Sequence, residues 1–208
     1  GLVAHESIQP YGKAPISASY VHVGVRTTLR DSNNQPIRVE STTPRPATLE
    51  EVKQFIADFG LATKNAKEVG FDGVEIHGAH GYLLHQFWVE QTNQRDDEYG
   101  GSRENRARLT LDVIDACVAA WDADHVGIRL SPLGTFNNVE AGYHEDENIW
   151  LIEQINKRGL MYLHLSEPDW AGGTPYSTEF RQRVRNAFGQ MIIAAGGYTP
   201  EKAEQNIK

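Results

Sequence analysis

The feature that most limits the possible folds of this chain is a regular alternation of helix-like and strand-like segments from residue 47 to the end. Four short apolar runs have the pattern of buried strands, and amphipathic segments precede, separate and follow them. The predicted strands are 71–77, 125–132, 160–168 and 190–197, and the predicted helices are 48–69, 102–121, 146–159, 177–188 and 199–208. Strict alternation implies a parallel sheet with right-handed crossovers. Because the runs are apolar almost throughout, we expect this sheet to be covered on both faces.

The first 46 residues are predicted to be irregular except for one β-hairpin. Residues 25–42 contain two β-rich arms on either side of a turn at 31–35. Thr48 then starts the first helix, with Glu51 three residues later completing a capping box. We therefore expect one domain over 1–208, with a loop and a capping hairpin in 1–46 and the alternating part in 47–208.

Two architectures fit this alternation, an open doubly wound sheet and a (β/α)8 TIM barrel. Polar residues fall at or just after the C-terminal ends of several strands, which is how barrel sites are built. They are His77, Arg129, Ser131, His164, Ser166 and Glu167. No G-x-G-x-x-G follows a strand, which weakens a dinucleotide-binding doubly wound sheet. The sequence therefore predicts an α/β barrel, truncated at both ends because only about four barrel strands are visible and a partial barrel leaves unpaired edges.

Composition excludes several classes of protein. The chain has 20 Lys and Arg against 28 Asp and Glu, and its net charge of −8 argues against a nucleic-acid or anionic-membrane partner. Cys117 is the only cysteine, which excludes an internal disulfide or a cysteine-built metal site and favours a reducing, cytoplasmic setting. No apolar run approaches the roughly 20 residues of a membrane-spanning helix.

The stretch 73–87 places His77, His80 and Tyr82 just past the end of a strand. One alternative is that these side chains only hydrogen-bond backbone within a loop. A zinc site would need a third ligand from elsewhere, and H-x-x-H is not the helical H-E-x-x-H pattern. Two neutral imidazoles can instead donate hydrogen bonds to one substrate oxygen while the phenol delivers a proton. That interpretation uses all three side chains.

Two further features are candidates for contact with a ligand. Arg129 lies inside an apolar strand, where a cation is costly unless it is paired. Two interpretations stay open for it: a salt bridge to a strand-end carboxylate such as Glu75, or a permanent cation facing an anionic or electron-accepting ring. Gly196 and Gly197 end the last strand just before a helix, which exposes backbone N–H groups toward a phosphate, although glycine pairs also make ordinary turns.

Long motifs in the sequence resemble the Old Yellow Enzyme family of flavin-dependent ene-reductases. They are EIHGAHGYLLHQF with NQRDDEYGGSRENRARLTLDVIDA after it, GIRLSPLGTF and YLHLSEPDWAGG. The resemblance covers essentially the whole chain and is strongest to the bacterial N-ethylmaleimide and nitrate-ester reductase branch. It implies a TIM barrel with FMN as cofactor and NADPH or NADH as reductant. It also implies three barrel strands before this chain and, after it, an eighth strand with a Gly-Arg phosphate clamp.

The resemblance assigns roles residue by residue. His77 and His80 match the pair that holds the carbonyl or nitro oxygen of the substrate above the flavin. Tyr82 matches the tyrosine that protonates the substrate α-carbon. Arg129 matches the arginine near the flavin N1/O2 edge, and the Gly196–Gly197 turn matches the one at the FMN phosphate.

Other matched positions lie around these residues. Arg38, in the predicted hairpin, is assigned to substrate or nicotinamide binding, and Trp170 resembles a position that lines the substrate pocket. His85 is predicted to be structural. Two departures from the family pattern, Asn137 in place of Gln and Leu2 in place of Arg, are predicted not to touch the reaction core.

These assignments imply two half-reactions at one site. NADPH or NADH reduces the flavin, and hydride then passes from flavin N5 to the β-carbon of an enone, maleimide or nitroalkene while Tyr82 supplies the proton. Nitro and nitrate-ester compounds are further expected substrates. The expected partner is a small electrophilic molecule, without nucleic acid or membrane, for a monomer or homodimer. The alternatives are a metal-dependent barrel hydrolase with His77 and His80 as ligands, and a barrel that binds a ligand without turnover.

Overall fold

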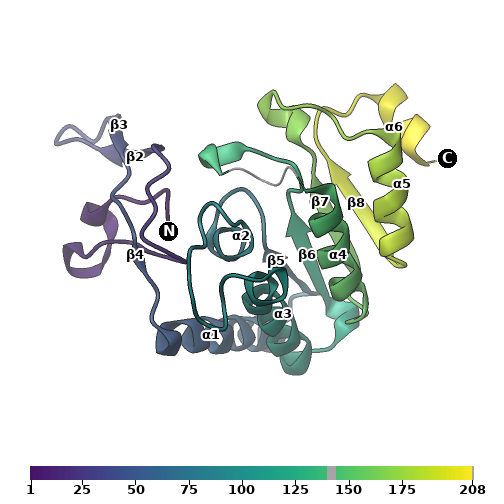
Figure 1. Cartoon of the computed structure of the whole chain (residues 1–208), viewed down its shortest axis with the longest axis horizontal. Coiled ribbons are helices and arrows are strands. Elements are labelled where there is room, and N and C mark those ends of the chain that lie inside the picture. Colours follow the sequence, from purple (N-terminus) through teal and green to yellow (C-terminus); the bar gives the residue numbers. More distant parts are fainter. Residues whose placement is uncertain (140–143, 208) are drawn as a thin grey trace.

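The computed structural model describes residues 1–139 and 144–207, and its larger part alternates strands with helices (Figure 1). The strands are β5 (Val74–His77), β6 (Val126–Leu130), β7 (Tyr162–Ser166) and β8 (Met191–Ala195). The helices are α1 (Leu49–Glu68), α2 (Leu83–Trp88), α3 (Arg103–Ala120), α4 (Glu145–Asn156), α5 (Thr178–Ala187) and α6 (Pro200–Ile207). The predicted alternation is confirmed, and Lys208, the end of the last predicted helix, lies outside the described residues. Within the described ranges, no helix is long and apolar enough to cross a membrane.

The start of α1 shows how closely local sequence sets these elements. Thr48 Oγ1 accepts a hydrogen bond from the Glu51 N–H at 3.2 Å, and Glu51 Oε2 accepts one from the Thr48 N–H at 2.9 Å. This is the predicted capping box, which satisfies two backbone donors that the first helical turn leaves free. The side-chain hydrogen bond from Arg45 is the main reason that the pKa of Glu51 falls to about 2. The helix therefore begins where the sequence predicts.

The strand order distinguishes between the two predicted architectures. All four strands are parallel and lie in the order β5-β6-β7-β8, which is also their order along the chain. A doubly wound sheet reverses its strand order at a switch point and carries helices on both faces. Sequential order with right-handed crossovers instead puts the connecting helices on one face, and α3, α4 and α5 follow one another along the sheet (Figure 1). The sheet is therefore a segment of a barrel.

The two faces of this sheet differ in chemistry. Ile76, Ile128 and Leu163 point toward the helices and are buried in the core. The alternate positions carry polar groups, and the register places Arg129 opposite both His77 and His164. Barrel strands turn every second side chain inward, where this chain carries polar groups, and the covering of this inward face stays a prediction.

The N-terminal part contains two small sheets. Strands β2 (Arg26–Arg30) and β3 (Pro36–Glu40) form the predicted antiparallel hairpin, while β1 (Ile16–Ser17) and β4 (Arg45–Pro46) form a parallel pair that the sequence did not reveal. Short 3-10 helices lie at Glu6–Ile8, Pro10–Gly12, Ala123–His125, Phe136–Asn138 and Pro168–Ala171. Arg95 Nη1 donates to the carbonyls of Ala18 at 3.0 Å and Ala47 at 2.7 Å. That side chain ties the N-terminal part to the barrel segment.

Candidate active site

The turn after β5 gathers the three aromatic side chains that the sequence singled out. The ring centroid of His77 lies 5.6 Å from that of His80 and 5.2 Å from that of Tyr82. The turn is tight because His80 and Gly81 both have positive φ, 59° and 71°. A Cβ at Gly81 would lie 2.7 Å from Val139 Cγ2, so glycine is needed there for space as well as for conformation. The backbone therefore folds the three rings into one cluster.

Side chains from the loop after β6 hold the backbone of His80 in this conformation. Its N–H donates to Ser131 Oγ at 2.9 Å, and its carbonyl accepts from Asn137 Nδ2 at 2.9 Å. These bonds offset the strain of a left-handed non-glycine residue, which costs on the order of 1–3 kcal/mol. Asn137 was predicted not to touch the reaction core, yet its amide bonds the backbone of His80. Leu2, by contrast, is buried in the core.

The environment of the cluster holds both histidines neutral near pH 7. Burial, followed by the Arg129 cation and the rings of His77 and His164, lowers the pKa of His80 to about 4. Burial and then Arg129 lower the pKa of His77 as well, and Glu75 partly opposes this shift. A neutral imidazole has one N–H donor and one bare nitrogen. Each ring can therefore donate one hydrogen bond to a substrate oxygen.

Arg129 lies beside the histidines but does not use the carboxylate proposed for it. Glu75 pairs with His164 instead, with Oε2 2.9 Å from Nδ1. Arg129 Nη2 donates to Ser166 Oγ at a long 3.4 Å, and its Nε is buried without a hydrogen-bond partner among the described residues. A buried donor without an acceptor costs roughly 1–3 kcal/mol. An acceptor edge on a bound ring, such as the N1/O2 edge of a flavin, fits this vacant donor.

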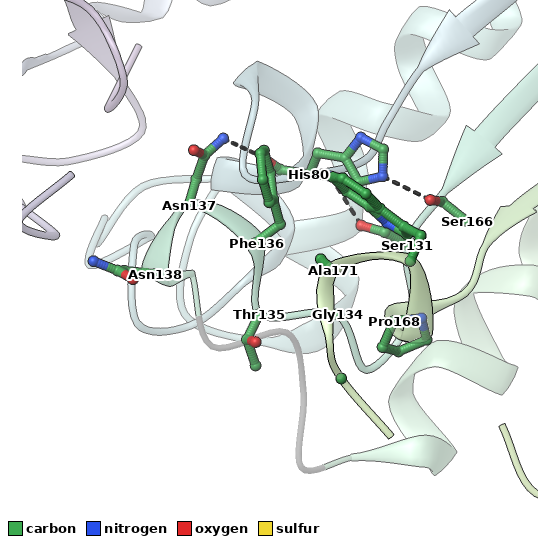
Figure 2. A pocket seen from close by; sticks show the side chains of 12 residues that line it. His80, Ser131, Gly134, Thr135, Phe136, Asn137, Asn138, Ser166, Pro168 and Ala171 are labelled. Carbon is green, nitrogen blue, oxygen red and sulfur yellow. Dashed lines mark hydrogen bonds between the residues drawn. The ribbon is translucent and has the colours of Figure 1, made fainter. Parts of the chain in front are cut away.

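A pocket of about 230 Å³ opens next to His80, between the loops after β6 and β7 (Figure 2). Trp170 and Phe136 flank the imidazole, with ring centroids 5.4 and 5.8 Å from it and 4.9 Å from each other. Trp170 is about half exposed, so its ring is open to a ligand. The structure thus brings Trp170 into the predicted cluster and adds Phe136, which the sequence did not single out.

The Gly196–Gly197 turn follows β8 as predicted, but its amide already has an acceptor. The Gly197 N–H donates to Asp169 Oδ1 at 2.9 Å, and the other oxygen of this carboxylate lies 2.7 Å from Lys202 Nζ. A Cβ at Gly196 would lie only 2.4 Å from Asp169 Oδ1. Glycine is therefore needed here for the close approach of a carboxylate, and binding of a phosphate by this turn stays a prediction.

Two other predicted residues lie outside the ring cluster. Arg38 is exposed in the hairpin, where its Nη1 donates to Thr28 Oγ1 at 3.0 Å. His85 lies in α2, which the sequence did not predict, and its Nδ1 accepts from the Gly81 N–H at 2.8 Å. His85 is buried, as a structural residue would be, and it stabilises the turn that carries His80.

Sequence reasoning noted Ser131 and Ser166 as polar strand-end residues but gave them no role. Both are buried, and both bond His80. Their position at the ends of β6 and β7 was the available signal. Within the part of the chain that the structure describes, no group of three or more His, Cys, Asp or Glu residues is placed to hold a metal ion. Strand-end Glu167 instead bonds Arg181 and Tyr198, each at 2.5 Å.

Known proteins share both the fold and the sequence of this chain. The solved structure of morphinone reductase superposes with a TM-score of 0.93 at 35% identity and covers all of this chain. The Old Yellow Enzyme homologue from Zymomonas mobilis superposes on 94% of the chain with a TM-score of 0.83 at 27% identity. Putative 12-oxophytodienoate reductase 11 from Oryza sativa subsp. japonica is 39% identical over 209 residues. The chain spans 56%, 54% and 56% of these three proteins, about half of each.

The fold is a segment of an α/β barrel that carries a polar site at the ends of its strands. The family model for the NADH:flavin oxidoreductase / NADH oxidase family matches residues 18–208, so the chain belongs to that family. The predicted resemblance to the Old Yellow Enzymes and the incomplete TIM-barrel fold are thereby confirmed. Family membership implies FMN as the cofactor. This agrees with the buried Nε–H of Arg129, which has no acceptor among the described residues.

Proposed function

We propose that the protein carrying this chain is an NAD(P)H-dependent reductase of activated C=C bonds. Its substrates are enones, maleimides and nitroalkenes, with nitro and nitrate-ester compounds as a further class. The support is the joint placement of two neutral imidazoles and a phenol at the end of β5, beside the Arg129 cation. FMN, when bound, supplies the hydride that it has received from NADPH or NADH. The remaining chemistry is carried by side chains of this chain.

His77 and His80 polarise the substrate. Both imidazoles are neutral and their rings lie 5.6 Å apart, so each can donate one N–H bond to the same carbonyl or nitro oxygen. Negative charge grows on that oxygen as the β-carbon accepts hydride. Preorganised donors aimed at developing charge are among the largest contributions to catalysis, on the order of 10²–10³-fold for one donor. The histidine pair therefore serves as an oxyanion clamp.

Tyr82 holds the proton that the reaction consumes. Its ring lies 5.2 Å from His77, and the side chain is 39% exposed. A phenol in this position can pass its proton to the α-carbon once hydride has reached the β-carbon. Solvent can then return a proton to the exposed tyrosine. The product is a saturated ketone, imide or nitroalkane.

Arg129 and the ring pair of Phe136 and Trp170 position the reactants. The buried Nε of Arg129 would hold the N1/O2 edge of the flavin, and its permanent charge would favour the reduced, anionic form. The two aromatic rings would line the substrate side of the pocket next to His80. We therefore propose for Trp170 the substrate-binding role that its sequence position implied.

The reductant is proposed to bind at the same face as the substrate. A solved structure of morphinone reductase, which superposes with a TM-score of 0.91 at 34% identity, is a complex with tetrahydroNAD. Arg38 is exposed in the hairpin and is the proposed contact for substrate or nicotinamide. We also take residues 1–208 as parts of a single flavin-binding domain, and place the protein in the N-ethylmaleimide reductase-like branch.

An assay of NADPH oxidation with and without 2-cyclohexenone tests this function. We expect a yellow preparation with a flavin spectrum whose NADPH oxidation under anaerobic conditions depends on the enone. A colourless protein with stoichiometric zinc would contradict the proposal and support a metal-dependent hydrolase. A yellow protein that oxidises no NADPH with any activated alkene would instead support a ligand-binding barrel.

A further inference from the structure

Ser166, the last residue of β7, lies between the Arg129 cation and the neutral His80 ring. Its Oγ is 2.8 Å from His80 Nε2 and 3.4 Å from Arg129 Nη2 (Figure 2 shows the first contact). The side chain is 1% exposed, so solvent cannot supply hydrogen-bond partners in place of these two residues. Ser166 therefore connects the arginine assigned to the flavin with the histidine assigned to the substrate.

Hydrogen-bond accounting fixes the direction of each bond. A guanidinium only donates, so Ser166 Oγ accepts from Arg129. The serine hydroxyl has one proton of its own to place, and His80 Nε2 is the acceptor that the described residues offer it. If Nε2 carried a proton instead, that hydroxyl proton would be buried without an acceptor, at a cost of roughly 1–3 kcal/mol. His80 Nε2 is therefore the bare nitrogen of a neutral ring.

We propose that Ser166 is a positioning residue that holds His80 in the tautomer with its proton on Nδ1. The Nδ1–H is then the donor that His80 presents to the substrate oxygen, while Nε2 is occupied by the serine. Ser131 complements this arrangement by fixing the backbone of His80 rather than its ring. Ser131 thus fixes the backbone of His80, and Ser166 determines which ring nitrogen carries the proton. The use of Nδ1–H on substrate rests on the proposed reductase function, but the tautomer itself does not.

The same contact links the two halves of the site. Arg129 donates a hydrogen bond to the serine oxygen. This makes the hydroxyl a better donor to His80, since hydrogen bonds in a chain polarise one another. Loss of the Ser166 hydroxyl would leave His80 free to exchange tautomers and would remove the Arg129 contact as well. Binding of the enone substrate should therefore weaken.

Nitrogen-15 NMR of the histidine side chains in the flavin-loaded protein tests this inference. We expect a neutral His80 ring with its proton on Nδ1 and a bare Nε2 at pH 7. In Ser166→Ala the ring should shift toward the Nε2–H tautomer, and KM for 2-cyclohexenone should rise about tenfold. Ser166→Thr, which keeps the hydroxyl, should restore the wild-type ring signals.

Ser131→Ala is the matched control, because it removes a buried hydroxyl that, among the described residues, bonds the backbone of the same histidine and not its ring. Its His80 ring should keep the proton on Nδ1. A wild-type ring protonated at Nε2 would overturn the inference without any variant, and so would a Ser166→Ala ring identical to wild type. An enone-inactive protein whose His80 still carries its proton on Nδ1 would overturn the proposed function and support the tautomer assignment.

Discussion

The outward face of the β5–β8 sheet carries buried core residues, whereas the inward face carries polar residues of the candidate site. Ile76, Ile128 and Leu163 face the helices, and each is at most 3% exposed. One residue further along the strands, His77, Arg129 and His164 lie side by side on the opposite face. Burial of the first set stabilises the fold, whereas the second set includes an arginine whose buried Nε has no acceptor among the described residues. Stability and chemistry are thus separated by a single step along a strand.

Substitution of Tyr82, in the turn that extends the inward face, should give the largest effect on chemistry. Tyr82→Phe removes the proposed proton but keeps the ring, so alkene reduction should slow by about 10²–10⁴-fold. Flavin reduction by NADPH and the midpoint of thermal unfolding should stay near their wild-type values. Stopped-flow measurement of the two half-reactions checks this, and equal slowing of both would rule out the proton-donor role.

Substitution of a residue on the outward face should lower stability and leave enone reduction nearly unchanged. Ile128 is fully buried beneath the helices, so Ile128→Ala should lower the free energy of unfolding by about 2–5 kcal/mol through lost burial and an unfilled cavity. Its effect on enone reduction by the folded fraction should be small. Urea unfolding together with enone kinetics at low temperature checks this pair of expectations. A folded variant with normal stability and a large loss of turnover would break the separation of the two faces.

His85 provides a smaller effect that depends on pH. Burial lowers the pKa of His85 to about 4, below the roughly 6.5 of an unfolded chain. The unfolded state therefore takes up the proton first, and stability present above pH 6.5 is lost as pH falls toward 4, by up to about 3 kcal/mol from this ring. His85→Asn keeps an acceptor for the Gly81 N–H and cannot titrate, so its stability should fall less over that range.

Unfolding curves between pH 7 and pH 4.5 measure this difference. Because His80 behaves in the same way, some pH dependence should remain in His85→Asn. The control is His144→Asn, which removes one imidazole at an exposed position. Its free energy of unfolding should change with pH as that of the wild type does. If the free energy of unfolding changed with pH equally in wild type and His85→Asn, His85 could not be a buried, neutral side chain beneath the turn.

The sequence predicted the outward face better than the inward one. Apolar periodicity, the Thr48 capping box and the turn after β2 depend on residues close in the chain, and all were predicted correctly. The parallel pair of β1 and β4 depends on residues far apart and gave no local signal. Helix α2 was missed because it is six residues long and follows the irregular turn at His80.

At the site, the residue types could be predicted but their partners could not. His77, His80 and Tyr82 stand close together in the sequence, so their cluster could be proposed from spacing alone. Ser166 lies 86 residues from His80, and the pairing of β5 with β6 and of β6 with β7 brings it to the ring. Likewise, Asn137 looked like a loop substitution until the fold placed its amide on the His80 carbonyl.

A phenol titration of the FMN-loaded protein tests whether His77 and His80 together hold an oxygen over the flavin. A phenolate held by both imidazoles should stack on the flavin and give a long-wavelength charge-transfer band. The variant with both His77→Ala and His80→Ala should bind the phenol at least about 100-fold more weakly, because two hydrogen bonds to a charged oxygen are lost. It should keep its FMN. An unchanged band with unchanged affinity in that variant would contradict the clamp.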